Sequence, residues 1–245
     1  MSPEAYLEMA ATETEHWWFR GRRDVLRSVL HGITLPRRAH VLEVGSGTGG
    51  NLEMLAEFGS VSGLEMDETA LALTARRTDG RFDIRAGHCP DDVPFDGHRF
   101  DLICFFDCLE HIVDDTESLA RMRDLMAPGG AIVVTVPAYQ WLWSAHDVFL
   151  HHHRRYSRES LIACARAAGY RIENVTYFNT LLFPLAAAAR LTDRLLRRNK
   201  SSGDAVPTER LNALLYSIFK AESRWLAYGT FPFGMSLLAV LTVDE

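Results

Sequence analysis

The amino-acid sequence predicts an α/β fold in which short buried strands alternate with amphipathic helices, and three observations predict it. An apolar run, 41–44, ends at a turn with three closely spaced glycines, and a helical pattern follows it. A second apolar run, 61–64, ends at the acidic residue Glu65. Further apolar runs alternate with helical patterns along the chain, which is typical of parallel strands joined by crossover helices.

The elements can be assigned in chain order from hydrophobic periodicity and turn residues. Residues 13–31 are expected to form a helix, because Trp18 and four aliphatic residues fall roughly on one face. The expected strands are 41–44, 61–64, 82–86, 100–106, 131–137, 170–178 and 235–243. The further expected helices are 119–126, 157–168, 181–198 and one that begins after Thr208.

The composition indicates a globular protein and excludes some classes of partner. The chain has 245 residues, of which 47% are hydrophobic and 24% are charged, and this suits a single domain. The net charge of −6 argues against a nucleic-acid partner, since nucleic-acid-binding domains are more often basic. The four cysteines form no C-x-x-C pair, and we find no signal peptide or membrane-spanning run, so we expect reduced thiols and a cytoplasmic protein.

The glycine turn predicts a site for a nucleotide-like cofactor. Glycine adopts positive φ and adds no Cβ, and the free N–H groups at a helix start attract a carboxylate or phosphate. Gly45, Gly47 and Gly50 match G-x-G-x-x-G, the fingerprint of dinucleotide-binding domains. Gly45, Gly47 and Gly49 match G-x-G-x-G instead. Glu65 suits the ribose hydroxyls in both cases, so the glycines alone leave two cofactors open.

The surrounding segments resemble class I S-adenosylmethionine-dependent methyltransferases of the small-molecule type. G-x-G-x-G is their glycine pattern, and Glu43 lies just before the first glycine, where they usually carry an acid. The segment 100–111, with its Leu-Glu-His turn, resembles their fourth strand. The segment 119–137, with its Pro-Gly-Gly turn, resembles their next helix and fifth strand. The order of these segments is that of the family.

The resemblance implies a Rossmann-like sheet of seven mostly parallel strands with helices on both faces. The seventh strand of this fold runs antiparallel beside the fifth. We expect a single methyltransferase domain over residues 1–245. Its expected parts are an N-terminal helical cap (1–38), a Rossmann-like cofactor-binding core (39–180), a helical lid inserted at the carboxyl edge of the sheet (181–230) and the final strand (231–245).

S-adenosylmethionine is therefore the expected cofactor, and the resemblance implies its contacts. The glycine turn would accept the methionine part, Glu65 both ribose hydroxyls and Met66 the adenine. An aromatic residue of 16–20 would face the sulfonium and Arg20 or Arg23 the carboxylate, unless this helix only packs on the core. The expected cofactor-binding residues are Trp18, Arg20, Glu43, Gly45, Ser46, Gly47, Gly49, Glu65, Met66, His88, Cys89, Asp107 and Leu109.

One position departs from the family pattern. The methyltransferases often place an acid just after the third strand, where it accepts from the adenine amine, and this chain has His88 there. A neutral histidine can accept through one ring nitrogen, a backbone carbonyl can replace it, and Asp91 or Asp92 is a further alternative. The adenine contacts therefore stay open.

A second polar group follows the fifth strand and also falls at the carboxyl edge of the sheet. A similar His/Arg-Arg-Tyr stretch in related methyltransferases looks like part of the acceptor site, and an arginine there would pair with an anionic group. The expected substrate-binding residues are Asp147, His151, Arg154, Arg155 and Tyr156. We expect no metal ion, because these histidines lack the H-E-x-x-H spacing and adjacent ones on an extended chain point to opposite sides. Solvated loop histidines are the structural alternative.

Methyl transfer from a sulfonium is an in-line displacement, which chiefly needs the nucleophile, methyl group and sulfur to be aligned. A hydroxyl or protonated amine must also lose a proton, and histidine suits this step near pH 7. The expected catalytic residues are His146 and His111. For His111, at the end of the fourth strand, a capping or core role is an equal alternative.

The sequence thus predicts a cytoplasmic S-adenosylmethionine-dependent methyltransferase that acts on a small or lipid-like molecule, chiefly at oxygen or nitrogen. The arginine-rich lid suits a weak contact with a membrane surface, and the oligomeric state stays open, with a homodimer as one alternative. Two other functions remain open. One is a nicotinamide-dependent oxidoreductase that uses the G-x-G-x-x-G pattern, and the other is a non-catalytic cofactor-binding or peripheral membrane protein.

Overall fold

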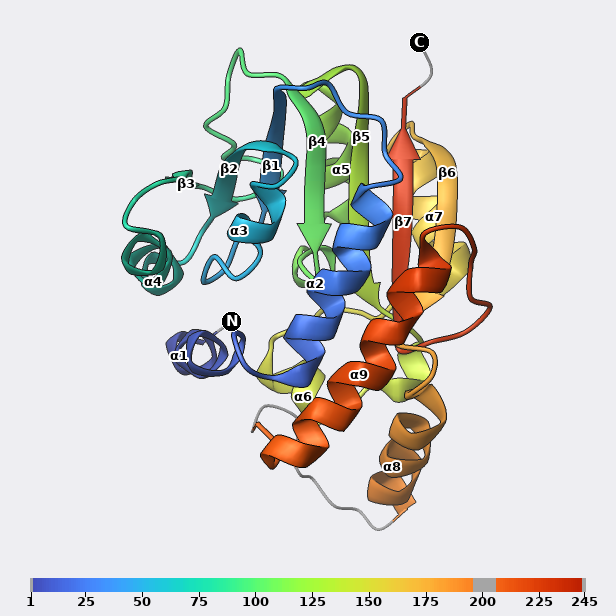
Figure 1. Cartoon of the computed structure of the whole chain (residues 1–245). Helices are drawn as coiled ribbons and strands as arrows, with labels where there is room; N and C mark the ends of the chain where they lie inside the picture. The colour runs from blue at the N-terminus through green and yellow to red at the C-terminus, as the bar shows by residue number, and fades with distance from the viewer. Residues whose placement is uncertain (1, 196–205, 244–245) are drawn as a thin grey trace.

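The computed structural model describes residues 2–195 and 206–243, and its centre is a seven-stranded sheet (Figure 1). The strands are β1 (Ala39–Val44), β2 (Gly59–Glu65), β3 (Asp83–Ala86), β4 (Phe100–Phe106), β5 (Met126–Pro137), β6 (Arg171–Phe178) and β7 (Ser236–Thr242). Their order is β3-β2-β1-β4-β5-β7-β6, and β7 runs antiparallel to its neighbours β5 and β6. The predicted Rossmann-like sheet of seven mostly parallel strands is confirmed, including the place of the seventh strand.

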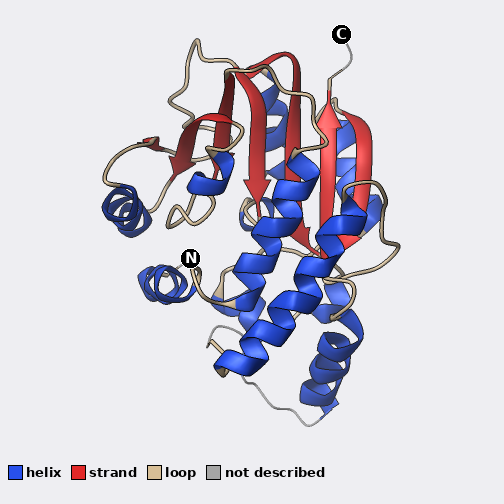
Figure 2. Cartoon of the chain, in the orientation of Figure 1, coloured by secondary structure: helices blue, strands red, loops and turns tan. Residues whose placement is uncertain are grey.

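Helices cover both faces of the sheet and one of its edges (Figure 2). The α-helices are α1 (Pro3–Thr12), α2 (Trp17–Leu30), α3 (Leu52–Leu55), α4 (Glu68–Thr78), α5 (Asp115–Arg123), α6 (Ala145–Phe149), α7 (Arg158–Ala167), α8 (Phe183–Leu195) and α9 (Glu209–Leu226). Two short 3₁₀ turns, Leu109–His111 and Gln140–Leu142, follow β4 and β5. Within the ranges described, no helix is long and apolar enough to cross a membrane.

Side chains of the central strands alternate between two apolar cores, because successive residues of a strand point to opposite faces. On β4, Ile103 lies in the core that α5 and α7 cover, whereas Leu102 and Cys104 lie in the core that α2 and α9 cover. Both faces of β4 are therefore buried, which explains its near-continuous apolar sequence.

The parallel strands β1, β2, β4 and β5 end at a common edge of the sheet. Figure 1 shows α1, α6 and α8 beyond this carboxyl edge, below the arrowheads. The glycine turn follows β1 there, Glu65 ends β2 and Asp107 follows β4. Open parallel sheets bind their ligands at this edge, so the fold brings the predicted cofactor residues to the expected place.

The helix expected over 13–31 is present as α2, but it begins at Trp17, and the structure adds a helix that was not predicted, α1, before residues 13–16. The side chain of Ser2 caps α1, and Pro3 occupies its first position. The ring of His16 caps α2. These local caps set the two helix starts, and the apolar stripe that indicated one helix belongs to α2.

The two helices of the expected lid, α8 and α9, take different places. α9 packs along α2, where Phe219 is fully buried and a Cβ on Gly21 would approach its ring to 2.5 Å. The Asn212 side chain joins α9 to the start of α2 by accepting from Trp17 N at 2.8 Å. α9 therefore covers a face of the sheet, while α8 lies beyond the carboxyl edge (Figure 1). Residues 196–205 of the expected lid lie outside the described residues.

Candidate functional site

The turn after β1 has a backbone that favours glycine at three positions. Gly45, Gly47 and Gly49 have φ of +69°, +56° and +79°, and residues with a Cβ rarely adopt such values. Gly45 is also crowded, since a Cβ there would lie 2.3 Å from Sγ of Cys108. Backbone hydrogen bonds from Gly45 and Ser46 to a carbonyl of β2 fix the turn in place. The turn therefore presents bare backbone at the carboxyl edge.

Glu65 ends β2 with a side chain that backbone donors hold in place. Its Oε2 accepts from Gly47 N at 2.7 Å, and its Oε1 accepts from the N–H groups of Met66 and Asp67, both at 2.9 Å. The hydroxyl of Tyr6, on α1, donates to the same Oε1 at 3.4 Å. Glu65 is buried, whereas Met66 beside it is 71% exposed. The carboxylate thus joins the glycine turn to α1.

Glu43, the acid of β1 before the glycines, is fully buried. Its Oε1 accepts from Asn51 Nδ2 at 2.7 Å, while its Oε2 has no hydrogen-bond partner within residues 2–195 and 206–243. Burial raises the pKa of Glu43 to about 8, and the Asn51 hydrogen bond and the charge of Arg22 oppose this effect in part. The buried Ser46 hydroxyl also lacks a partner in the described part of the chain. Two buried oxygens with unused hydrogen-bonding capacity thus flank the glycine turn.

Arg22 of α2 is a buried arginine at this edge that sequence analysis missed. Its guanidinium pairs with Asp107 Oδ2 at 2.6 Å and lies 5.2 Å from the ring centroid of Trp18. Arg20 lies elsewhere, with its guanidinium carbon 4.1 Å from the ring centroid of Tyr216 on α9. This differs from the expectation for Arg20, because residues two apart on a helix are about 200° apart around its axis. Arg22, and not Arg20, therefore lies beside Asp107 at the carboxyl edge.

Glu13 ties the segment between α1 and α2 to the glycine turn. Its carboxylate is buried, accepts from the Thr48 hydroxyl and pairs with Arg77 of α4 at 2.6 Å. Burial raises the pKa of Glu13 above its usual value, although the Thr48 hydrogen bond and the nearby arginines act to lower it. Sequence analysis also missed Glu13 and Tyr6, although Ser2-Pro3 is a recognisable signal for the start of α1.

The segment after β3 forms a small turn around His88. His88 is exposed, and its backbone pairs with that of Asp92 through hydrogen bonds of 2.7 and 2.9 Å. Cys89 is buried, and burial raises the pKa of its thiol to about 12. Leu109, after β4, is fully buried in the same core. Of these three residues expected to bind the cofactor, only His88 has an exposed side chain.

Asp147, near the start of α6, is the centre of a buried network. Its carboxylate accepts from Arg155 Nε at 2.6 Å and Nη2 at 3.1 Å, and from His152 Nδ1 at 3.0 Å. The backbone N–H and hydroxyl of Ser144 donate to it at 2.8 and 3.0 Å. Burial acts to raise the pKa of Asp147, but these hydrogen bonds outweigh it and hold that pKa well below its usual range. Asp147 and Arg155 were expected to bind substrate, and the structure instead pairs them with each other.

Arg154 and Tyr156 are engaged with a protein carboxylate as well. The Arg154 guanidinium and the Tyr156 hydroxyl both lie 2.7 Å from Asp115 Oδ2. The expected anion clamp is therefore an internal ion pair. His151 is exposed with a φ of +58°, and His146 lies half-buried on α6.

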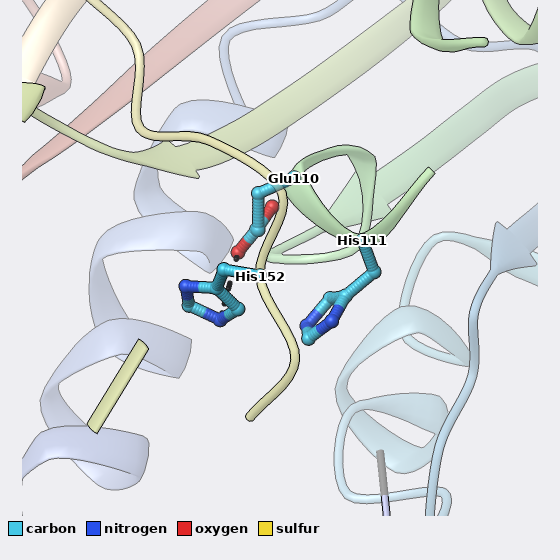
Figure 3. Close-up of side chains that lie close together, drawn as sticks. All are labelled: Glu110, His111 and His152. Atoms are coloured by element: carbon cyan, nitrogen blue, oxygen red, sulfur yellow. Dashed lines mark ion pairs between the residues drawn. The ribbon is translucent and has the colours of Figure 1, made fainter. Parts of the chain in front are cut away.

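Glu110, His111 and His152 lie together although they come from two distant segments (Figure 3). His152 Nε2 is 4.0 Å from Glu110 Oε1, and the ring centroids of His111 and His152 are 4.6 Å apart. Glu110 is 1% exposed, and its Oε2 finds no hydrogen-bond partner among the described residues. Burial raises the pKa of Glu110 well above its usual range and lowers that of His111 to about 3. Sequence analysis missed Glu110 and His152, because only the fold brings the two segments together.

Aromatic side chains gather beyond β5 and β6. Tyr139, with a φ of +61°, stacks on Tyr177 with ring centroids 5.3 Å apart. The ring centroid of Phe183, on α8, lies 5.7 Å from that of Tyr139. Trp141 and Phe233 lie beside Phe183 and are 47% and 43% exposed. These five residues, called the aromatic group below, form a partly exposed apolar surface.

A comparison with protein families gives one match that covers most of this site. A family model described as a methyltransferase domain matches residues 18–175. The matched region runs from α2 into β6 and includes the glycine turn, Glu65 and the turn after β4. It therefore includes the residues that were expected to bind the cofactor.

Curated relatives are similar over part of their length. A probable S-adenosylmethionine-dependent methyltransferase of Mycolicibacterium smegmatis is 27% identical over 65% of this chain and 62% of that protein. A ubiquinone biosynthesis O-methyltransferase of Coxiella burnetii is 26% identical over 62% of this chain and 71% of its own length. Phosphoethanolamine N-methyltransferase 2 of Caenorhabditis elegans is 30% identical over 39% of this chain and 23% of that enzyme. The matched region thus spans less than two thirds of two of these three relatives.

Solved structures share the fold. A methyltransferase of Haloferax volcanii, in complex with the Trm112 methyltransferase activator, has a TM-score of 0.65 at 19% identity, and the match covers 99% of this chain and 94% of that chain. Phosphoethanolamine N-methyltransferase 2 of Haemonchus contortus, in complex with phosphomonomethylethanolamine and S-adenosylhomocysteine, has a TM-score of 0.57 at 19% identity. That match covers 90% of this chain and 52% of the other.

Proposed function

This chain belongs to the family of class I S-adenosylmethionine-dependent methyltransferases, and on that premise we propose that it methylates an oxygen or nitrogen atom of a small or lipid-like acceptor. The observation that carries the proposal is the junction of the glycine turn with Glu65, where Gly47 N lies 2.7 Å from the carboxylate. The names of two relatives, an O-methyltransferase and an N-methyltransferase, support the two acceptor atoms. The family match also decides between the two cofactors that the glycines leave open.

The residues at the carboxyl edge fit S-adenosylmethionine, which supplies an electrophilic methyl group on a sulfonium. Glu43 Oε2, which lacks a partner in the ranges described, offers an acceptor for a polar group beside the glycine turn. Glu65 would accept the ribose hydroxyls, and Arg22 would pair with the carboxylate of the methionine part. The exposed side chains of Met66 and His88 would cover the adenine.

The aromatic group and α8 would contact the acceptor. Leu181 and Leu185, which lie near Phe183, are 52% and 66% exposed and extend the apolar surface. Such a surface supports an acceptor that carries a ring or an alkyl part. A weak contact of this region with a membrane surface stays a prediction, and so does a homodimer.

The rate enhancement would come mainly from alignment of the acceptor atom with the methyl group and sulfur. A hydroxyl or ammonium acceptor must also lose a proton. The residue proposed to receive it is His146 on α6, which lies at the carboxyl edge. His111, in the turn after β4, lies at the same edge but is the weaker acceptor, because burial lowers its pKa to about 3.

Calorimetric titration of the full chain with S-adenosylhomocysteine tests the proposal, with NADH titrated in parallel. We expect the first compound alone to bind. We then expect transfer of a labelled methyl group to at least one member of a panel of phenolic, amine and lipid-like acceptors. A chain that is folded by circular dichroism and yet does not bind S-adenosylhomocysteine would contradict the proposal.

A Glu65→Gln variant is expected to bind S-adenosylhomocysteine roughly 10- to 100-fold more weakly, because a hydrogen bond to a charged acceptor contributes about 1.5–3 kcal/mol. Glutamine keeps one oxygen for the backbone donors but places an NH₂ group where the second oxygen stood. The same calorimetric titration measures the change. Glu68→Gln, at an exposed acid of α4, is the matched control. Equal affinities of the two variants would refute the role of Glu65.

A further inference from the structure

We propose that Glu110, His111 and His152 form a binding site for a divalent transition-metal cation, with Zn²⁺ as the best match. Each side chain offers one ligand atom, and the three atoms lie within 4.8 Å of one another. Figure 3 shows one carboxylate and two imidazoles from two segments gathered in one place. Two histidines and one glutamate are a ligand set of catalytic zinc sites, where a further position stays open to water or substrate.

The buried carboxylate of Glu110 lacks a counter-charge, because the arginines near it are paired with other carboxylates. The guanidiniums nearby are paired at 2.6 Å, Arg22 with Asp107 and Arg155 with Asp147. Glu110 Oε2 is buried and accepts no hydrogen bond from the part of the chain that is described. A buried carboxylate costs free energy unless a cation or a proton compensates it. A divalent cation held also by two imidazoles supplies this compensation.

Both imidazoles are oriented by supporting groups. His152 Nδ1 lies 3.0 Å from Asp147, which leaves Nε2 on the side of Glu110 at 4.0 Å. The backbone of His151 interacts with the ring of His111 and favours its protonated form. Metal-binding histidines usually donate the second ring N–H to such a carboxylate or carbonyl, which fixes the ring and strengthens the ligand. The two rings are therefore held as metal-binding histidines are.

The choice of Zn²⁺ follows from the ligand types, since imidazole nitrogen favours zinc and related metals while Mg²⁺ prefers oxygen. The site departs from the expectation of no metal ion, which considered the histidines of 146–153 by themselves. The fold adds Glu110 and His111 from the turn after β4. His153, next to His152 in the chain, is exposed and lies outside the cluster, so it provides a control.

Cation binding does not depend on methyl transfer, but any use of the cation in catalysis rests on the proposed function. An acceptor hydroxyl bound at an open coordination position would lose its proton more readily. His111 would then act as a ligand, and the proton would pass to His146 or to water.

Calorimetric titration of the metal-free full chain with ZnCl₂ tests the inference. We expect one Zn²⁺ per chain. A change to a residue that only supports a metal ligand lowers the affinity roughly 10- to 100-fold. The affinity for Zn²⁺ should fall by more than this in Glu110→Gln and in His152→Gln. It should be unchanged in the control, His153→Gln. Co²⁺ gives a second measurement on the wild-type chain, through visible absorption bands of the bound ion that Zn²⁺ should abolish.

Absence of stoichiometric Zn²⁺ binding by the folded wild-type chain would overturn the inference. Binding that survives in both Glu110→Gln and His152→Gln would also overturn it, and so would binding that disappears in His153→Gln alone. The titration contains no S-adenosylhomocysteine and no acceptor. A failure here is therefore distinct from a failure of the proposed function.

Discussion

An Asp147→Ala variant is expected to have a free energy of unfolding about 3–5 kcal/mol smaller than that of the wild-type chain. The carboxylate is fully buried and accepts from Arg155 at 2.6 Å and from His152 at 3.0 Å. Its removal leaves the buried guanidinium without a counter-charge, which costs more than the pair contributes when intact. Urea unfolding at neutral pH, followed by circular dichroism, measures the difference.

Asp96→Ala is the matched control for this change. Asp96 pairs with Arg121 at 3.5 Å, but its side chain is 94% exposed, and surface pairs contribute about 0–1 kcal/mol. The control variant should therefore unfold almost as the wild-type chain does. Equal small losses in the two variants would show that Asp147 is not the centre of a stabilising network. Because Asp147 also orients His152, its removal should weaken Zn²⁺ binding by roughly 10- to 100-fold.

The glycine turn and Glu65 could be predicted from the sequence because their signals are local. A strand that ends in closely spaced glycines implies a tight turn at a helix start, and the acid that ends the next strand lies beside it in any parallel sheet. The antiparallel seventh strand is different. Its place beside β5 followed from the family resemblance, since no local pattern of β7 distinguishes a parallel from an antiparallel neighbour.

The residues that were missed depend on packing between distant segments. Arg20 and Arg22 are chemically equal in the sequence, and the orientation of α2 against the sheet decides which one is buried beside Asp107. The same limit applies to His152. In the sequence it looks like the neighbouring histidines, and only its contact with the turn after β4 in the folded chain distinguishes it from them. The apolar stripe of α9 was predicted, but its packing against α2 was not. Periodicity defines an apolar face and does not show which element covers that face.

Glu43→Gln is expected to stabilise the protein, and the gain should grow with pH. Burial raises the pKa of Glu43 to about 8, against about 4.3 in an unfolded chain. A carboxyl whose pKa is raised by folding holds its proton more tightly in the folded state. Its contribution to stability is full below about pH 4 and is lost as the pH rises toward 8, at about 1.4 kcal/mol for each pKa unit. Glutamine does not ionise, so the variant escapes this loss.

Between about pH 5 and pH 8.5, the free energy of unfolding of the Glu43→Gln variant should therefore rise by about 2–4 kcal/mol relative to that of the wild-type chain. Urea unfolding across this range measures the trend, and Glu8→Gln, at an exposed acid of α1, should show almost none. A difference that does not vary with pH would mean that the folded chain keeps Glu43 ionised throughout. If the trend appears, Glu43 lowers stability beside the glycine turn, a cost that is typical of residues that serve a ligand. The same variant should then bind S-adenosylhomocysteine more weakly while it unfolds less readily, and this opposition separates a role in cofactor binding from a role in the fold.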